Sequence, residues 1–191
     1  MTTQTITQDN KQSQVIQRLL AIATFTALTV LGAKVTLEIG PIPFTLQTMV
    51  VFLAGMVLGG RDAALSQIGY IGLLAVGLPV DARSLGVGVF AGPTWGFIVG
   101  FVPAAFVVGF ICERFGNKLI VHLLAALAGA CIYFTTGTIV LMSVTGMGFV
   151  LALYNGVLKF LMIDFAKALM ASALARSPMP QAFWGLLRRG Q

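Results

Sequence analysis

Long apolar stretches separated by short polar breaks dominate this chain. Six stretches rich in Leu, Ile, Val, Phe, Ala and Gly follow a polar start. Most of them approach the roughly 20 residues that a helix needs to cross the hydrocarbon core of a bilayer. The pattern predicts an all-α membrane protein with six transmembrane helices, at residues 17–36, 46–60, 62–79, 93–113, 118–143 and 158–176.

The breaks between these stretches are rich in glycine, proline and charged residues, which end helices and form turns. No internal repeat or soluble second domain is visible, so we predict one transmembrane domain over residues 17–180. A polar segment without hydrophobic periodicity precedes it, and we expect residues 1–16 to be a disordered tail. Residues 181–191 are predicted to be a basic cytoplasmic tail.

The composition excludes an ordinary soluble domain. Hydrophobic residues make up 58% of the chain and charged residues only 9%, whereas soluble domains carry about 25% charged residues. The net charge of +6 does not indicate a nucleic-acid partner, because the distribution of Lys and Arg follows the membrane topology. With the N-terminus inside, eight Lys and Arg residues fall on the cytoplasmic side and two in the outer loops. The positive-inside rule therefore places both termini in the cytoplasm.

Asp164 and Lys167 are charges inside the last apolar stretch. Each ionised side chain at the centre of a bilayer costs about 2.5–3.5 kcal/mol on insertion scales, so such residues usually face a cavity or each other. Because the two residues are three apart, a helix projects them from nearly the same face. They are either a ligand site or a buried structural pair.

Four further polar residues are candidates for the same site. Thr45 and Gln47 lie where the predicted helix 46–60 begins, and they either cap that helix or face a ligand. Arg83 lies in an outer loop. It either belongs to a solvated turn with a weak surface ion pair or places a cation over a ligand. Tyr70 is either a packing aromatic or a hydrogen-bond donor in a cavity.

Ala23 and Ala27 form a small-xxx-small pair in the first predicted helix. Such a pair allows another helix to approach closely. Similar pairs of small residues recur along the chain, for example Gly55 with Gly59 and Gly96 with Gly100. Internal packing explains most of these pairs.

No catalytic motif accompanies these residues. The sequence contains no G-x-x-x-x-G-K-[ST] phosphate loop, no H-E-x-x-H, no G-x-S-x-G and no metal-spaced set of Cys and His. We therefore predict that the chain is not an enzyme and needs no metal or cofactor. A carboxylate beside an ammonium group suits a small amphipathic metabolite with an amide-like head.

Three segments resemble one known family. They are PIPFTLQTMVVFLAGMVLGGRDAALSQIGYIGLLAVGLPV at 41–80, GPTWGFIVGF at 92–101 and GVLKFLMIDFAKA at 156–168. Together they resemble the BioY proteins, the biotin-specific S components (substrate-binding subunits) of energy-coupling factor (ECF) transporters. The P-[IV]-P-F-T-L-Q-T stretch combined with a downstream D-x-x-K is the specific part of this resemblance.

The resemblance implies the ECF S-component fold and a role in biotin uptake. Six transmembrane helices in a prokaryotic plasma membrane would enclose an outward-facing pocket, with biotin as the transported ligand. A transmembrane coupling protein and two cytoplasmic ATPases would drive its inward release, consistent with the missing phosphate loop. Two alternatives remain open: an S component for thiamine or riboflavin, or a biotin transporter that works alone.

The resemblance also implies roles for individual residues. Asp164 and Lys167 match the D-x-x-K and are expected to contact the ureido head of biotin. Thr45 and Gln47 would line or cover the pocket. Arg83 would meet the valerate carboxylate. The spacing of Ala23 and Ala27 matches the feature with which the family docks onto its coupling protein. Lys159 departs from the family pattern, which commonly has prolines before the aspartate.

Overall fold

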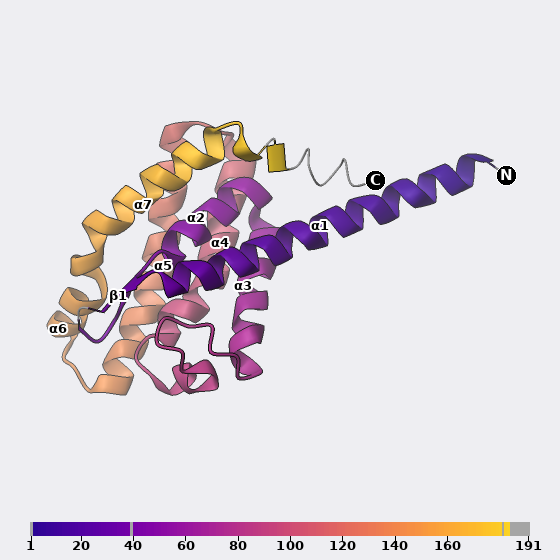
Figure 1. Cartoon of the computed structure of the whole chain (residues 1–191). Helices are drawn as coiled ribbons and strands as arrows, with labels where there is room; N and C mark the ends of the chain where they lie inside the picture. The colour runs from indigo at the N-terminus through magenta and orange to yellow at the C-terminus, as the bar shows by residue number, and fades with distance from the viewer. Residues whose placement is uncertain (1, 39, 181, 184–191) are drawn as a thin grey trace.

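Apolar helices make up nearly all of the structure, a computed structural model that describes residues 2–38, 40–180 and 182–183 (Figure 1). The predicted helical architecture is confirmed. The helices are α1 (Thr2–Lys34), α2 (Gln47–Leu58), α3 (Gly60–Ala75), the 3-10 helix η1 (Gly86–Ala91), α4 (Trp95–Phe115), α5 (Leu119–Thr145), α6 (Phe149–Leu153), the π-helical turn η2 (Tyr154–Leu158) and α7 (Lys159–Arg176).

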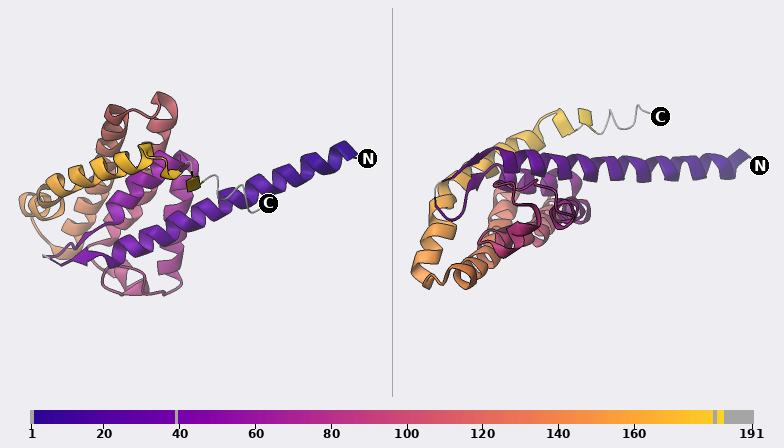
Figure 2. Two further views of the ribbon diagram at one scale, coloured as in Figure 1. Left: turned by 45° about the horizontal axis from the view of Figure 1, so that its top comes forward. Right: turned by 60° about the horizontal axis from the view of Figure 1, so that its bottom comes forward.

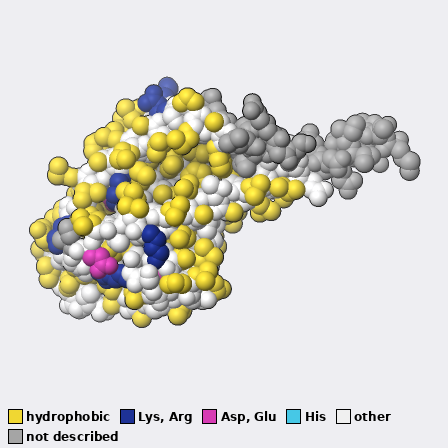
Figure 3. Space-filling model, in the orientation of Figure 1, with side chains coloured by type: hydrophobic (Ala, Val, Ile, Leu, Met, Phe, Trp, Pro, Cys, Tyr) yellow, Lys and Arg dark blue, Asp and Glu magenta, His cyan; other side chains and the backbone are white. Residues whose placement is uncertain are grey.

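Four helical stretches within the described residues are long and apolar enough to cross a membrane: Gln12–Lys34, Trp95–Phe115, Leu119–Thr145 and Phe149–Arg176. The last of these joins α6, η2 and α7. The helices α2 and α3 overlap the predicted spans 46–60 and 62–79, but they end at Leu58 and Ala75 and have only 12 and 16 residues. At 1.5 Å per residue they are about 18 and 24 Å long, against a hydrocarbon core of about 30 Å. Hydrophobic side chains are spread over much of the bundle surface shown in Figure 3, as expected where helices meet lipid.

The first helix is longer than predicted. It begins at Thr2, and its N-terminal half extends beyond the bundle (Figures 1 and 2). The sequence had led us to expect disorder over residues 1–16. The difference has a simple reason, because extending an existing helix by one residue is far easier than nucleating a new one. The predicted tail at 181–191 lies outside the described residues except for Ala182 and Phe183.

A small β-ribbon follows α1 and was not predicted. Strands β1 (Thr36–Leu37) and β2 (Phe44–Thr45) pair antiparallel, with Thr36 opposite Thr45. Two residues per strand are too few to produce a visible alternation in the sequence. The Leu46 N–H donates to the carbonyl oxygens of Gly32 and Val35. The ribbon and its loop (residues 35–46) therefore stay attached to the end of α1.

Glycines bring the α2–α3 turn into direct contact with α4. A Cβ atom at Gly109 of α4 would lie 2.5 Å from Gly60 Cα, closer than real Cβ contacts. Between the two helices, Gly59 has φ +81°, a backbone conformation that glycine adopts without steric cost. The small residues at this crossing therefore serve internal packing, as the sequence suggested for most such pairs.

Polar contacts join α1 to other parts of the protein at each end of the bundle. At one end, Lys34 Nζ donates to the carbonyl oxygens of Pro79 and Asp81, at 2.6 and 2.8 Å. At the other end, Arg18 Nε donates to both carboxylate oxygens of Asp62, at 2.7 and 2.9 Å. Loop 35–46, which directly follows Lys34, and loop 76–94 therefore lie at the same end of the bundle.

Candidate functional site

A buried ion pair lies on the inward face of α7. Lys167 Nζ donates to Asp164 Oδ1 at 2.7 Å, and the two side chains are only 7% and 5% exposed. The helix buries Phe160, Asp164, Lys167 and Ala168 and leaves Phe165 exposed. Spacings of three and four residues place these buried positions on one face. The predicted pair is therefore present and points into the protein.

Two residues from other helices complete the hydrogen bonding of this pair. Thr48 at the start of α2 donates its hydroxyl to Asp164 Oδ1 at 2.9 Å, and Tyr133 in the middle of α5 donates to Oδ2 at 2.5 Å. Lys167 Nζ also donates to Thr48 Oγ1 at 3.0 Å. Buried charges need such partners. We call these four residues the Asp164 cluster.

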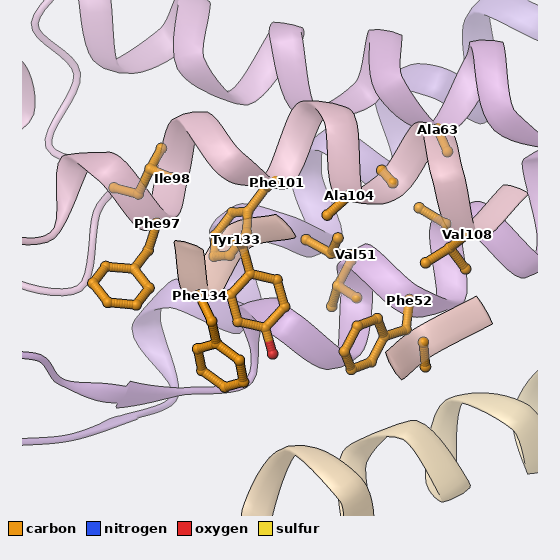
Figure 4. Packing of buried hydrophobic residues seen from close by; sticks show 14 of the residues in the cluster. Val51, Phe52, Ala63, Phe97, Ile98, Phe101, Ala104, Val108, Tyr133 and Phe134 are labelled. Atoms are coloured by element: carbon orange, nitrogen blue, oxygen red, sulfur yellow. The ribbon is translucent and has the colours of Figure 1, made fainter. Parts of the chain in front are cut away.

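Aromatic packing fixes the position of Tyr133. Its ring packs against Phe134 at 4.5 Å and edge-on against Phe101 at 5.8 Å between ring centroids. Gly100 of α4 leaves room for the α5 backbone, because a Cβ atom there would lie 2.8 Å from Tyr133 Cα. In Figure 4 the Tyr133 hydroxyl projects out of this apolar cluster toward α7. The packing therefore directs one polar atom at Asp164.

The Asp164 cluster borders a cavity between the helices and the two loops of this end. About 630 Å³ of space that no protein atom fills lies between these elements, part of it open to solvent. Its walls are largely aromatic and aliphatic. They comprise Ile42, Pro43, Thr45, Gln47, Thr48, Asp81, Ala82, Arg83, Leu85, Val89, Thr94, Phe97, Ile98, Phe101, Tyr133, Phe134, Phe160, Asp164 and Lys167.

Thr45 and Gln47 form part of the cavity wall at the entrance to α2. The Thr45 hydroxyl donates to Gln47 Oε1 at 3.2 Å and accepts from the Gln47 backbone N–H at 3.3 Å. Gln47 is 5% exposed, and its Nε2 makes no hydrogen bond of good geometry with any described residue. An amide nitrogen carries two N–H donors, so Gln47 can donate to a ligand as well as to a protein neighbour.

Tyr70 is not part of the cavity wall. It is fully buried in the core on α3, and its hydroxyl interacts with the side chain of Gln47. Tyr70 therefore does not face the cavity as the other candidates do, and it is connected to the site only through Gln47.

Arg83 joins the two loops over the cavity. Its guanidinium Nη2 donates to the Gly40 carbonyl oxygen at 3.2 Å, and its Nε lies 3.6 Å from Glu38 Oε2. The neighbouring Asp81 is 3% exposed and accepts the backbone N–H groups of Arg83 and Gly86, at 3.0 and 2.9 Å. Loop 76–94 is therefore an ordered cover rather than a solvated turn.

Loop 35–46 also closes over the cavity. Phe44 of β2 stacks on Phe160 of α7, with ring centroids 4.3 Å apart and an interplanar angle of 24°. Ile42 and Pro43 from the same loop are buried and line the cavity. Stacked aromatic pairs contribute about 0.5–1.5 kcal/mol beyond the area they bury. The structure therefore represents a covered form of the site.

The donor set does not suit a metal ion. No group of three or more His, Cys, Asp or Glu side chains is arranged around a common point in the part of the chain that the structure describes. His122 is buried, and its Nδ1 lies 3.0 Å from Ser172 Oγ. The site consists of hydrogen-bonding groups and apolar walls.

Comparison with known proteins identifies the family. A family model described as the BioY family matches residues 2–183. The chain belongs to the BioY family. The resemblance seen in the sequence is confirmed, and members of this family are named as transporters, not as enzymes.

Two relatives and one solved structure show how far the likeness extends. The probable biotin transporter BioY of Lysinibacillus sphaericus is 43% identical over 108 residues, 56% of this chain and 55% of that protein. The biotin transporter BioY of Rhizobium etli is 35% identical over 173 residues, 84% and 92% of the two chains. The crystal structure of the S-component for biotin from an ECF-type ABC transporter superposes with a TM-score of 0.79 at 25% identity, covering 85% of this chain and 90% of that one.

In this member of the BioY family the structure brings together most of the residues that the sequence singled out. Thr45, Gln47, Arg83, Asp164 and Lys167 all line one cavity. Sequence reasoning missed Tyr133 and did not assign Thr48 to the site. A tyrosine in the middle of an otherwise apolar span was an available signal, because a buried hydroxyl normally has a partner.

Proposed function

We propose that this chain is a biotin-binding S component that takes part in biotin uptake. In this proposal six helices cross the plasma membrane of a prokaryotic cell and both termini lie in the cytoplasm. The covered cavity then faces outward, because the loops 35–46 and 76–94 lie at the end opposite the cytoplasmic loops. Of the two short helices, α2 would cross the membrane largely buried within the bundle, and α3 would present Leu65 and Ile68 to lipid.

One observation carries the proposal: the Asp164 cluster borders an otherwise largely apolar cavity. A ureido head has two N–H donors and one carbonyl acceptor. Asp164 already accepts three hydrogen bonds, and an ionised carboxylate has about four acceptor positions, so one N–H of the ligand can still bind. Lys167 has three N–H donors and uses two. The third can donate to the ureido oxygen, and the Gln47 amide can supply a further N–H donor.

The remaining walls suit the other parts of biotin. Phe97, Phe101 and Phe134 line the cavity and can pack against the thioether ring and the alkyl chain. Burial of this apolar surface contributes about 25 cal/mol per Å². Arg83 at the mouth is a candidate contact for the valerate carboxylate.

We also propose that the outward face of α1 binds a partner helix. Ala23 and Ala27 are exposed, whereas Phe25 and Thr29 on the other face are buried. Small exposed residues at a spacing of four allow close helix approach. The expected partner is the ECF transmembrane coupling protein, which would bring two cytoplasmic ATPases. The same chain could also work without dedicated ATPases.

Titration of the detergent-purified protein with biotin tests the proposal. We expect biotin to bind at least about 100-fold more tightly than thiamine or riboflavin, a difference of about 2.7 kcal/mol. Desthiobiotin lacks the sulfur ring and keeps the ureido head, so it should bind with similar affinity. Tighter binding of thiamine or riboflavin, or no binding of biotin, would refute the assignment.

Replacement of Tyr133 by Phe should weaken biotin binding by about tenfold, because the ring still packs but Asp164 loses one of its donors. Isothermal titration measures the change, and the midpoint of thermal unfolding shows whether the bundle is intact. Tyr154→Phe is the matched control, since Tyr154 is 52% exposed. An unchanged affinity in Tyr133→Phe would show that this hydroxyl does not support the site.

A further inference from the structure

Lys159 is a cation that the proposed function does not yet use. It is the first residue of α7 and directly precedes Phe160 of the cavity wall. Its Nζ donates to Asn155 Oδ1 at 2.8 Å and lies 5.0 Å from the centre of the Tyr154 ring. Within the described residues it has no carboxylate partner, whereas Arg83 has Glu38. The charge of Lys159 is therefore uncompensated.

Lys159 and Arg83 approach the same point of loop 35–46. The position of a Cβ atom at Gly40 would lie 3.8 Å from Lys159 Nζ, and the Gly40 carbonyl oxygen lies 3.2 Å from Arg83 Nη2. The two cations come from different elements, α7 and loop 76–94, and each lies next to Gly40. Figure 3 shows Lys and Arg side chains gathered around an acidic group at this end of the molecule.

We propose that Lys159 and Arg83 together form the binding site for the carboxylate of the ligand, at the mouth of the cavity beside Gly40. This inference rests on the proposed biotin-binding function and adds a second cation to it. Lys159 uses one of its three N–H donors on Asn155, which leaves two for a carboxylate. A carboxylate has two oxygens and can accept from both cations at once.

The geometry also explains how the bound carboxylate would hold the cover closed. Its two partners belong to elements that touch the tip of loop 35–46, and Phe44 of that loop stacks on Phe160, the residue after Lys159. An anion between the cations would relieve their mutual repulsion while loop 35–46 is closed. The ligand therefore stabilises the covered form that encloses it.

Comparison of biotin with biotinamide, its uncharged primary amide, tests the inference. In Lys159→Met we expect affinity for biotin to fall about fivefold. This corresponds to about 1 kcal/mol, the binding free energy that one partly exposed charge pair contributes. Affinity for biotinamide should not change, since the amide carries no charge. Lys159→Arg should retain the preference for biotin. Lys118→Met, which removes an exposed cation at the α4–α5 turn, is the matched control and should bind both ligands as the unmodified chain does.

The outcomes separate this inference from the proposed function. Absence of biotin binding in the unmodified chain refutes the proposed function itself. If the unmodified chain binds biotin but Lys159→Met loses affinity for biotin and biotinamide equally, Lys159 has only a structural role and the inference is wrong. Unchanged biotin affinity in Lys159→Met likewise overturns it. If Lys159→Met fails to fold, the ratio of biotin to biotinamide affinity is compared in Lys159→Arg and Arg83→Met. A ratio kept in Lys159→Arg and reduced in Arg83→Met supports the inference. The same ratio in both variants overturns it.

Discussion

Replacement of Asp164 by Asn is expected to reduce biotin affinity by at least about 100-fold. The neutral amide is a weaker acceptor for the ureido N–H, and it leaves Lys167 as a buried cation without its carboxylate. Losing one partner of a buried charge pair costs about 3–5 kcal/mol, part of which appears as lost fold stability. Isothermal titration of the purified variant with biotin measures the affinity.

Two further variants make this experiment decisive. Asp62→Asn makes the same change in the Arg18–Asp62 pair at the opposite end of the bundle and should bind biotin normally. The double variant Asp164→Asn/Lys167→Met removes both buried charges, so it should regain most of the lost stability. It should still fail to bind. Biotin affinity close to that of the unmodified chain in either Asp164 variant would show that this carboxylate does not recognise the ligand.

Replacement of Gly109 by Val is expected to destabilise the bundle by about 3 kcal/mol or more, because overpacking against rigid backbone exceeds the usual 1–3 kcal/mol. A Cβ atom there meets Gly60 Cα at 2.5 Å, and backbone cannot rotate aside as a side chain can. The expected result is a lower midpoint of thermal unfolding in detergent, or failure to purify as a monodisperse protein.

Gly72→Ala is the control for this substitution. Gly72 lies in α3, and an added Cβ there meets no atom within 4 Å. Alanine is favoured over glycine by about 1 kcal/mol in a helix, so this variant should be at least as stable as the unmodified chain. If Gly109→Val and Gly72→Ala unfold at the same temperature, the close approach of α4 to the α2–α3 turn does not contribute to stability.

The polar residues show where prediction from sequence succeeded. Asp164 and Lys167 were identifiable because charges inside an apolar span are unfavourable unless something compensates them. Thr45, Gln47 and Arg83 were identified from their place in loops or at the start of a helix. All five line the cavity.

Tyr133 and Thr48 show where prediction failed. Neither residue is near Asp164 in the chain, and their hydrogen bonds to it span 31 and 116 positions. Whether a hydroxyl on α5 faces α7 depends on how far α5 is rotated about its axis. Close packing sets that rotation, for example Gly100 against the backbone of Tyr133. When a span is apolar on all sides, its sequence pattern does not predict this rotation.

Lys159 is a second case of this kind. In the sequence it was a third charge in the last apolar stretch without a role. Only the folded loop 35–46 shows that its ammonium group lies beside Gly40, the residue that also binds Arg83. The two cations are 76 positions apart (159 − 83) in the sequence, so no local pattern relates them.

The amino-acid pattern along the chain was enough to predict the class of the protein, the approximate positions of its helices and its unusual charges. These follow from the free energy of placing apolar and charged groups in a bilayer, which depends on composition over about 20 residues. The tertiary structure alone decided which side chains meet: Thr48 and Tyr133 on Asp164, Phe44 on Phe160, and two cations at Gly40. Such contacts depend on helix rotation and on close approach at glycines, which arise only when the helices pack together.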